Sequence, residues 1–84
     1  MSDLTPQERM FAFALKSYSK RSRKSIVRRQ DLLSDHVFMT ETYLATNSQT
    51  PGQQLSYIVQ KLNRKGYVTM LERGKYRIED TPLI

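Results

Sequence analysis

The sequence predicts a small α+β protein in which helices precede a C-terminal β-hairpin, and three observations support this. Two segments begin with Thr-Pro, at Thr5 and at Thr50, and each continues with apolar residues at helical spacing. A glycine, Gly66, ends the second segment. Alternating residues on both sides of Gly74 then indicate two short strands joined by a tight turn.

The length and composition indicate one domain covering residues 1–84. A chain this short buries only about 60% of its unfolded surface, so it holds a single modest core. It contains no cysteine, which excludes disulfides and thiolate metal sites. No apolar run approaches the roughly 20 residues of a membrane span, and the N-terminus lacks the apolar core of a signal peptide. We therefore expect a soluble cytoplasmic protein of a bacterium, archaeon or phage, associated with the nucleoid, with no membrane contact and no secretion signal.

The first helix is expected over residues 5–19. Thr5 suits the N-cap, Pro6 suits the first helical position, and Glu8 closes a capping box. The expected apolar face consists of Met10, Phe11, Ala14, Leu15 and Tyr18. Phe13 lies off this face, so it either widens the core or is exposed. We expect it to widen the core; an exposed Phe13 would instead indicate a surface for a partner.

A polar stretch separates this helix from the next. The segment Ser17–Ser25 has too few apolar residues to pack, so a loop or a frayed helix end is expected. Ile26 and Val27 predict a very short strand that joins the hairpin. A second helix is expected over 29–39, and 46–49 is turn-like. The residues expected to pack inward are Leu32, Leu33, His36 and Val37, then Tyr43 and Leu44.

The third helix, expected over 50–65, has the clearest amphipathic pattern. Thr50 is expected to cap it, Pro51 takes the first helical position, and Gln53 can reach back to the cap. Gly66 tolerates the positive φ that ends a helix. The expected core positions are Leu55, Ile58, Val59 and Leu62.

The hairpin is expected over 67–79, with Gly74 in its turn. This register places Leu71 opposite Tyr76 with both side chains in the core, and Lys75 and Arg77 on the other face. An isolated hairpin is marginally stable, so this one must pack on the helices. Three helices followed by a hairpin, with a short third strand, define a winged helix-turn-helix fold.

The distribution of charge suggests a polyanionic partner. The net charge is +6, and acidic residues are absent between Arg9 and Gln30 and again over Thr42–Leu71. Two basic segments that converge in the fold favour nucleic acid, whereas the alternative is a solvated surface with a random excess of lysine and arginine.

The outer face of the third helix suits a DNA major groove, because it offers hydrogen-bonding groups and cations without a carboxylate. Any surface helix has a polar outer face, so the prediction also depends on the basic hairpin beside it. The expected base-reading residues are Gln53, Gln54, Ser56, Tyr57 and Gln60. The expected phosphate-binding residues are Thr50, Lys61, Arg64, Lys65, Arg73, Lys75, Arg77, Arg28 and Arg29.

The stretch LSYIVQKLNRKGYVTMLERGKYRI, residues 55–78, resembles the third helix and wing of winged-helix DNA-binding domains. It looks most like the C-terminal winged helix of restriction endonucleases of the Dam-replacing type, through VQKLNRKGYV and RGKYRI. In that resemblance Gly66, Gly74 and Tyr76 are structural positions. The resemblance implies a DNA-binding module without nuclease activity, because the catalytic part of such enzymes is a separate domain. It places at the groove Gln53, Gln54, Tyr57 and Gln60. The basic segment Lys16–Arg29 departs from the pattern.

Residues that would support catalysis are not apparent. His36 is the single histidine, and we expect it to be packed or half-buried rather than a ligand. Asp31 and Asp35 are one helical turn apart, which is usual for solvated carboxylates, and a metal site needs more oxygen ligands. No glycine-rich phosphate loop or activated nucleophile is present. We therefore expect no enzyme activity, no metal and no cofactor.

The favoured function is double-stranded DNA binding, as a small transcriptional regulator. The alternative is a winged-helix module for protein–protein interaction or an accessory factor of a nucleic-acid-processing complex, which exposed Phe13, Met39 or Met70 would favour. Structured RNA is a third partner, although the aromatic platform of single-strand readers is missing. A homodimer is possible, with Phe11 or Phe13 of the first helix at its interface.

Overall fold

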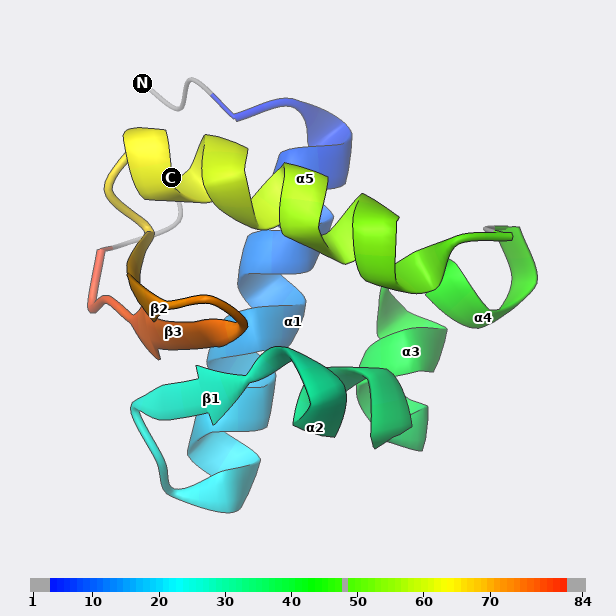
Figure 1. The fold of residues 1–84 in the computed structure, drawn as a ribbon, viewed down its shortest axis with the longest axis horizontal. Helices are drawn as coiled ribbons and strands as arrows, with labels where there is room; N and C mark the ends of the chain where they lie inside the picture. Colours follow the sequence, from blue (N-terminus) through cyan, green and yellow to red (C-terminus); the bar gives the residue numbers. More distant parts are fainter. Residues whose placement is uncertain (1–3, 48, 82–84) are drawn as a thin grey trace.

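The computed structural model describes residues 4–47 and 49–81, and within this range the chain folds into five helices and a three-stranded antiparallel sheet (Figure 1). The elements in chain order are α1 (Pro6–Ser22), β1 (Ile26–Arg28), α2 (Arg29–Ser34), α3 (His36–Glu41), α4 (Leu44–Asn47), α5 (Pro51–Arg64), β2 (Val68–Glu72) and β3 (Lys75–Ile78). The α+β class is confirmed, and the arrangement is compatible with a small winged-helix fold. The prediction of three helices was wrong, since α3 and α4 were not expected as separate helices.

Helix α1 starts with the predicted capping box. The Thr5 hydroxyl accepts from the Glu8 backbone N–H at 3.1 Å, and the Glu8 carboxylate accepts from the Thr5 N–H at 2.9 Å. The helix runs further than expected, to Ser22, and ends at Arg23 in the left-handed region with φ of 57°. Of the cations in the stretch expected to be a loop or a frayed helix end, Lys20 and Arg21 are therefore helical, whereas Arg23 and Lys24 follow the end of the helix.

The predicted second helix is two helices that meet at Asp35. This residue adopts an extended backbone, and its carboxylate accepts from the Phe38 N–H at 2.9 Å, so it caps α3. The same carboxylate accepts from Arg21 at 2.9 Å, and this hydrogen bond holds the pKa of Asp35 below its ordinary value. The break changes which residues face inward: Phe38 is buried, while Val37 and His36, both expected to pack, are exposed.

A left-handed residue also alters the segment after α3. Tyr43 has φ of 58° and is 56% exposed, so the prediction that it packs inward was wrong, whereas Leu44 is buried as expected. The turn expected over 46–49 is partly replaced by α4, and Ser48 lies outside the described residues.

The sheet has the order β1–β3–β2, so the short predicted strand does join the hairpin. Tyr76 pairs with Val27 on one side and with Met70 on the other. A bulge between Met70 and Glu72 leaves Leu71 39% exposed. The predicted pairing of Leu71 with Tyr76 was therefore wrong by one residue, because the bulge adds a residue to β2.

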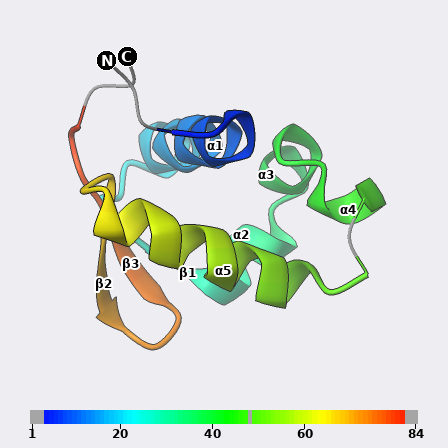
Figure 2. The same cartoon turned by 90° about the horizontal axis from the view of Figure 1, so that it is seen from above.

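One core joins all five helices of the described residues and the inner face of the sheet. Its members are Leu4, Phe11, Ala12, Ala14, Leu15, Val27, Leu32, Phe38, Leu44, Leu55, Ile58, Val59, Leu62, Tyr67, Val68 and Tyr76. Phe13 is 60% exposed, which contradicts the expectation that it widens this core. Figure 2 shows α1 and α3 along one side of α5, while the hairpin extends from the opposite side. None of the helices in the described ranges is long and apolar enough to cross a membrane.

Candidate nucleic-acid interface

A groove of about 420 Å³ lies between the outer face of α5 and the hairpin. It is lined by Arg29, Gln53, Ser56, Tyr57, Gln60, Met70, Arg73, Gly74 and Tyr76. The lining contains two arginines and no carboxylate. A polyanion can therefore approach this groove without meeting a negative side chain.

The amphipathic pattern of α5 sets which residues reach the groove. Its four buried residues point to the core, so Gln53, Tyr57 and Gln60, one to two turns apart on the other side, are exposed. Arg64 continues this exposed face at the end of the helix. The Lys61 ammonium lies 4.4 Å from the centre of the Tyr57 ring, one turn away. This contact orients a large aromatic side chain that is 55% exposed.

Arg29 joins three elements at the edge of the groove. Its backbone N–H donates to the Gly74 carbonyl at 2.8 Å, and its Nη1 donates to the Ser56 hydroxyl at 3.0 Å. Ser56 also hydrogen bonds with Tyr76, which lies buried beneath the groove, and burial raises the pKa of Tyr76 above its ordinary value. The Tyr76 phenol therefore stays neutral at physiological pH. The guanidinium of Arg29 is held in place while Arg29 as a whole remains exposed.

A second hollow of about 400 Å³ adjoins the hairpin turn. Its lining consists of Arg28, Arg29, Gln30, Glu72, Arg73, Gly74 and Lys75. The register of β1 and β3 sets Arg28 directly opposite Lys75, so their side chains leave the same face of the sheet. Like charges in this position destabilise a sheet, and an anion bound between them would relieve the repulsion.

Several predicted contact residues do not line the groove, and three of them have other neighbours in the fold. Gln54 is half-buried in a different hollow, between α1 and the segment that precedes α5. Lys65 forms an ion pair of 2.7 Å with Glu8, which is almost fully buried in α1. Arg77 points from the outer face of the sheet and pairs with Glu79 at 3.0 Å. The first two have other neighbours inside the fold, and the third is paired with Glu79 at a position away from the hairpin turn.

The start of α5 differs from the prediction in one respect. Thr50 occupies the N-cap position and is exposed, as a phosphate contact would require, but its side chain makes no capping hydrogen bond. The Thr-Pro signal therefore located the helix start correctly without specifying the hydrogen bonding there.

The basic segment Lys16–Arg29 is not a uniform phosphate-binding loop. Arg21 donates to Asp35, and Lys16 donates to the Glu79 backbone carbonyl at 3.2 Å. Cations of the segment that remain exposed include Lys20, Arg23, Lys24 and Arg28. Part of the charge predicted for nucleic acid therefore stabilises the fold.

Met70 was not predicted as part of the site. It is 40% exposed and lines the groove, and its backbone N–H donates to the Asn63 side chain at 3.2 Å, which fastens β2 to α5. Its position depends on the bulge that follows it, and the sequence has no glycine or proline there to indicate one. Sequence reasoning had no signal from which to find this residue.

The described residues contain no group of three or more His, Asp or Glu side chains that could hold a metal ion. Comparisons with protein-family models, with curated proteins and with solved structures give no match to this chain. The resemblance to the winged helix of Dam-replacing-type endonucleases therefore stays a prediction.

Proposed function

We propose that this chain is a winged-helix protein that binds double-stranded DNA. The N-terminal half of α5 would enter the major groove, and the hairpin would lie on the adjacent backbone as the wing. The observation that carries the proposal is the carboxylate-free groove between α5 and the hairpin, whose lining includes two glutamines, two tyrosines and two arginines. Glutamine pairs with adenine edges, and cations neutralise phosphates, so these residue types match the surface of a duplex.

The residues divide into two roles. Gln53, Tyr57 and Gln60 are exposed along the face of α5 and would contact base edges. Ser56 is half-buried beneath Arg29, so it positions that arginine more than it reads bases. The cations that would contact phosphates are Arg28, Arg29, Lys61, Arg64, Arg73 and Lys75. Lys65, Arg77 and Gln54 are left out of this interface because of the neighbours they already have.

A small DNA-binding chain without catalytic groups fits a transcriptional regulator of the cytoplasm. It would act by occupying a site on DNA rather than by chemistry on it. No cofactor is required for this role.

Fluorescence anisotropy of the purified protein on a labelled mixed-sequence duplex, across a salt series, tests the proposal. Each phosphate that the protein neutralises contributes about −0.9 to the slope of log K against log salt. Binding that weakens steeply with salt is expected. No binding at low salt would contradict the DNA proposal despite the positive charge.

The exposure of Phe13 and Met70 favours a second function, docking to an acidic protein. That function predicts weak DNA binding that does not depend on duplex length.

Structured RNA is tested by competition with a matched RNA duplex in the same assay, because the RNA duplex would displace the labelled DNA from a protein that prefers RNA.

A further inference from the structure

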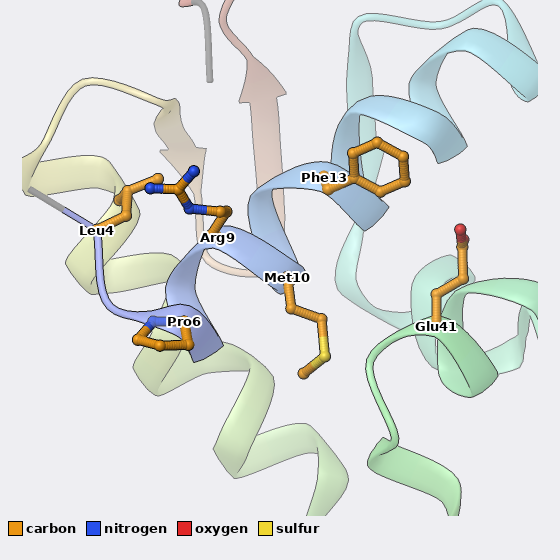
Figure 3. A pocket seen from close by; sticks show the side chains of 6 residues that line it. All are labelled: Leu4, Pro6, Arg9, Met10, Phe13 and Glu41. Carbon is orange, nitrogen blue, oxygen red and sulfur yellow. The ribbon is translucent and has the colours of Figure 1, made fainter. Parts of the chain in front are cut away.

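Another hollow, on the α1–α3 side of the molecule, is more apolar than the groove between α5 and the hairpin. It has a volume of about 750 Å³ and is lined by Leu4, Pro6, Arg9, Met10, Phe13 and Glu41 (Figure 3). We call these six residues the Phe13 surface. Four of them are apolar, and the remaining two carry opposite charges.

Phe13 is the most exposed large apolar side chain among the described residues. It is 60% exposed, whereas Phe11, two positions earlier on α1, is 1% exposed. Met10 is half-buried beside it and packs on the core. An exposed aromatic ring next to a partly buried methionine forms an apolar patch that a further protein surface can cover.

Glu41 has an unsatisfied oxygen at the edge of this surface. Its Oε1 is buried and has no hydrogen-bond partner. Arg21 is close enough for the Glu41 charge to help raise its pKa, but the Arg21 guanidinium donates to Asp35 instead. A buried carboxylate oxygen without a donor is unfavourable, and Glu41 as a whole is only partly buried, so a cation placed against its carboxylate from outside would stabilise the charge.

Arg9 is the cation of the same surface, and it does not reach Glu41 within the chain. Figure 3 shows its guanidinium directed away from Glu41, with Met10 and Phe13 between the two residues. The ion pairs found among the described residues do not include one between Arg9 and Glu41. The surface thus carries a positive group on one side of its apolar centre and a negative group on the other.

We propose that the Phe13 surface is a two-fold interface with a second copy of this chain. A two-fold axis near Phe13 would place Arg9 against the partner's Glu41 and Glu41 against the partner's Arg9. A patch with opposite charges on either side of an apolar centre is self-complementary, which is what a two-fold interface requires. The Phe13 rings and the Met10 side chains of both copies would cover each other at the centre.

This dimer does not depend on DNA binding. Helices α1 and α3 lie on the opposite side of α5 from the hairpin (Figure 2), so the interface would leave the groove uncovered in both copies. Loss of one property without the other is therefore expected in suitable variants.

Sedimentation equilibrium over a range of protein concentrations tests the interface. The wild-type chain is expected to be dimeric at the upper end, and Phe13→Gln is expected to weaken the dimer at least about tenfold, since a central aromatic is lost. Ile26→Thr is the matched control, because Ile26 is 41% exposed on the sheet and lies outside the surface. A wild-type chain that is monomeric throughout, or a Phe13→Gln variant as dimeric as the wild type, would overturn the proposal.

A charge exchange gives a sharper test. Arg9→Glu and Glu41→Arg, each alone, place like charges at both pairs of the dimer and are expected to be monomeric. Mixed together, the two variants form a heterodimer in which both pairs are again of opposite charge, so association should return. Circular dichroism verifies that each variant is folded. Where Glu41→Arg is not folded, Arg9→Glu is mixed with Glu41→Gln, which restores one of the two opposite pairs, so the mixture should associate more strongly than Arg9→Glu alone. Folded variants that stay apart on mixing would overturn the two-fold arrangement.

Discussion

Helices α1 and α5 both start with Thr-Pro, but the two starts differ in their hydrogen bonds and in their exposure. In α1 the box closes, because Thr5 and Glu8 exchange two hydrogen bonds, and Glu8 is then buried. In α5 the third helical position is Gln53, which is exposed and lines the groove. One helix start is thus held inside the fold by hydrogen bonds, and the other leaves its third residue exposed beside the groove.

The residue at the third helical position accounts for the difference. The Glu8 carboxylate also accepts from Lys65 at 2.7 Å, so it links the start of α1 to the end of α5. That hydrogen bond lowers the pKa of Glu8, which stays ionised. A carboxylate at Gln53 would instead face the groove and repel a polyanion. Thr-Pro therefore marks a helix start in both cases, while the residue at the third helical position decides whether that start is buried in the fold or exposed beside the groove.

Gln53→Glu is expected to have the largest effect on binding. It introduces a negative charge into the groove, and unfavourable charge contacts at interfaces cost several kcal/mol, which corresponds to about a hundredfold or greater loss of DNA affinity. The free energy of unfolding should stay the same or rise slightly, since glutamate suits the first turn of a helix. Anisotropy and urea unfolding measure the two quantities. Gln7→Glu, in the first turn of α1, is the control and should bind DNA nearly as the wild type does.

Lys65→Met is expected to have the next largest effect, on stability alone. It leaves the almost fully buried Glu8 carboxylate without its cation, which costs about 3 kcal/mol. Urea unfolding measures this loss. Lys61→Met is the control, because Lys61 lies one turn earlier on α5, is only partly buried and belongs to none of the ion pairs found among the described residues; it should change stability by less than about 0.5 kcal/mol. Unchanged stability in Lys65→Met would mean that the Lys65–Glu8 ion pair does not stabilise the packing of α1 on α5.

Glu8→Gln is expected to lower stability by about 1–2 kcal/mol at neutral pH, because a charged hydrogen bond is lost while the capping geometry is retained. The folded-state pKa of Glu8 lies below the ordinary 4.5, so its contribution is complete above that value and disappears as pH falls through the lowered pKa. The stability difference between wild type and variant should therefore shrink in acid. Unfolding at pH 7 and below pH 4 tests this, with Asp80→Asn as an exposed control. A constant difference at all pH values would contradict the assignment.

Arg73→Gln is expected to give the smallest effect. Arg73 lines both hollows beside the hairpin turn, so its loss should weaken all duplexes by a similar small factor and make the salt slope shallower by about 0.9. Gln53→Ala should instead weaken the preferred sequence selectively, by about 1–3 kcal/mol. Identical behaviour of the two variants across sequences would show that base and backbone contacts are not divided in this way.

Much of the fold could be predicted because local signals specify it. The capping box at Thr5, the glycine stop at Gly66 and the spacing of apolar residues in α5 each depend on neighbours along the chain. The break at Asp35 could not be predicted, because apolar residues continue at helical spacing through it. The Asp35 carboxylate is held by Arg21, which is distant in sequence, and this contact is not visible in the local pattern. The bulge at Leu71 was missed for the same reason, because it depends on pairing with β3.

The candidate site was predicted in part. The outer face of α5 follows from its periodicity, so Gln53, Tyr57 and Gln60 are exposed together. Sequence alone could not indicate which cations are already paired. Lys65 belongs to a basic run with Arg64, yet it reaches Glu8, which is distant in sequence. A long side chain at the edge of a helix face can point to solvent or back along the protein surface. Which direction it takes depends on a partner that only the tertiary fold brings near.

The central claim is that DNA contacts the groove between α5 and the hairpin. Titration of the isotope-labelled protein with a short duplex, followed by amide and side-chain NMR, tests it most directly. The account predicts that the largest shift changes fall on Gln53, Tyr57 and Gln60 and on the hairpin turn at Arg73, with little change at Arg9 and Glu41. Shift changes concentrated on the α1–α3 side, or none at stoichiometric duplex in low salt, would contradict it.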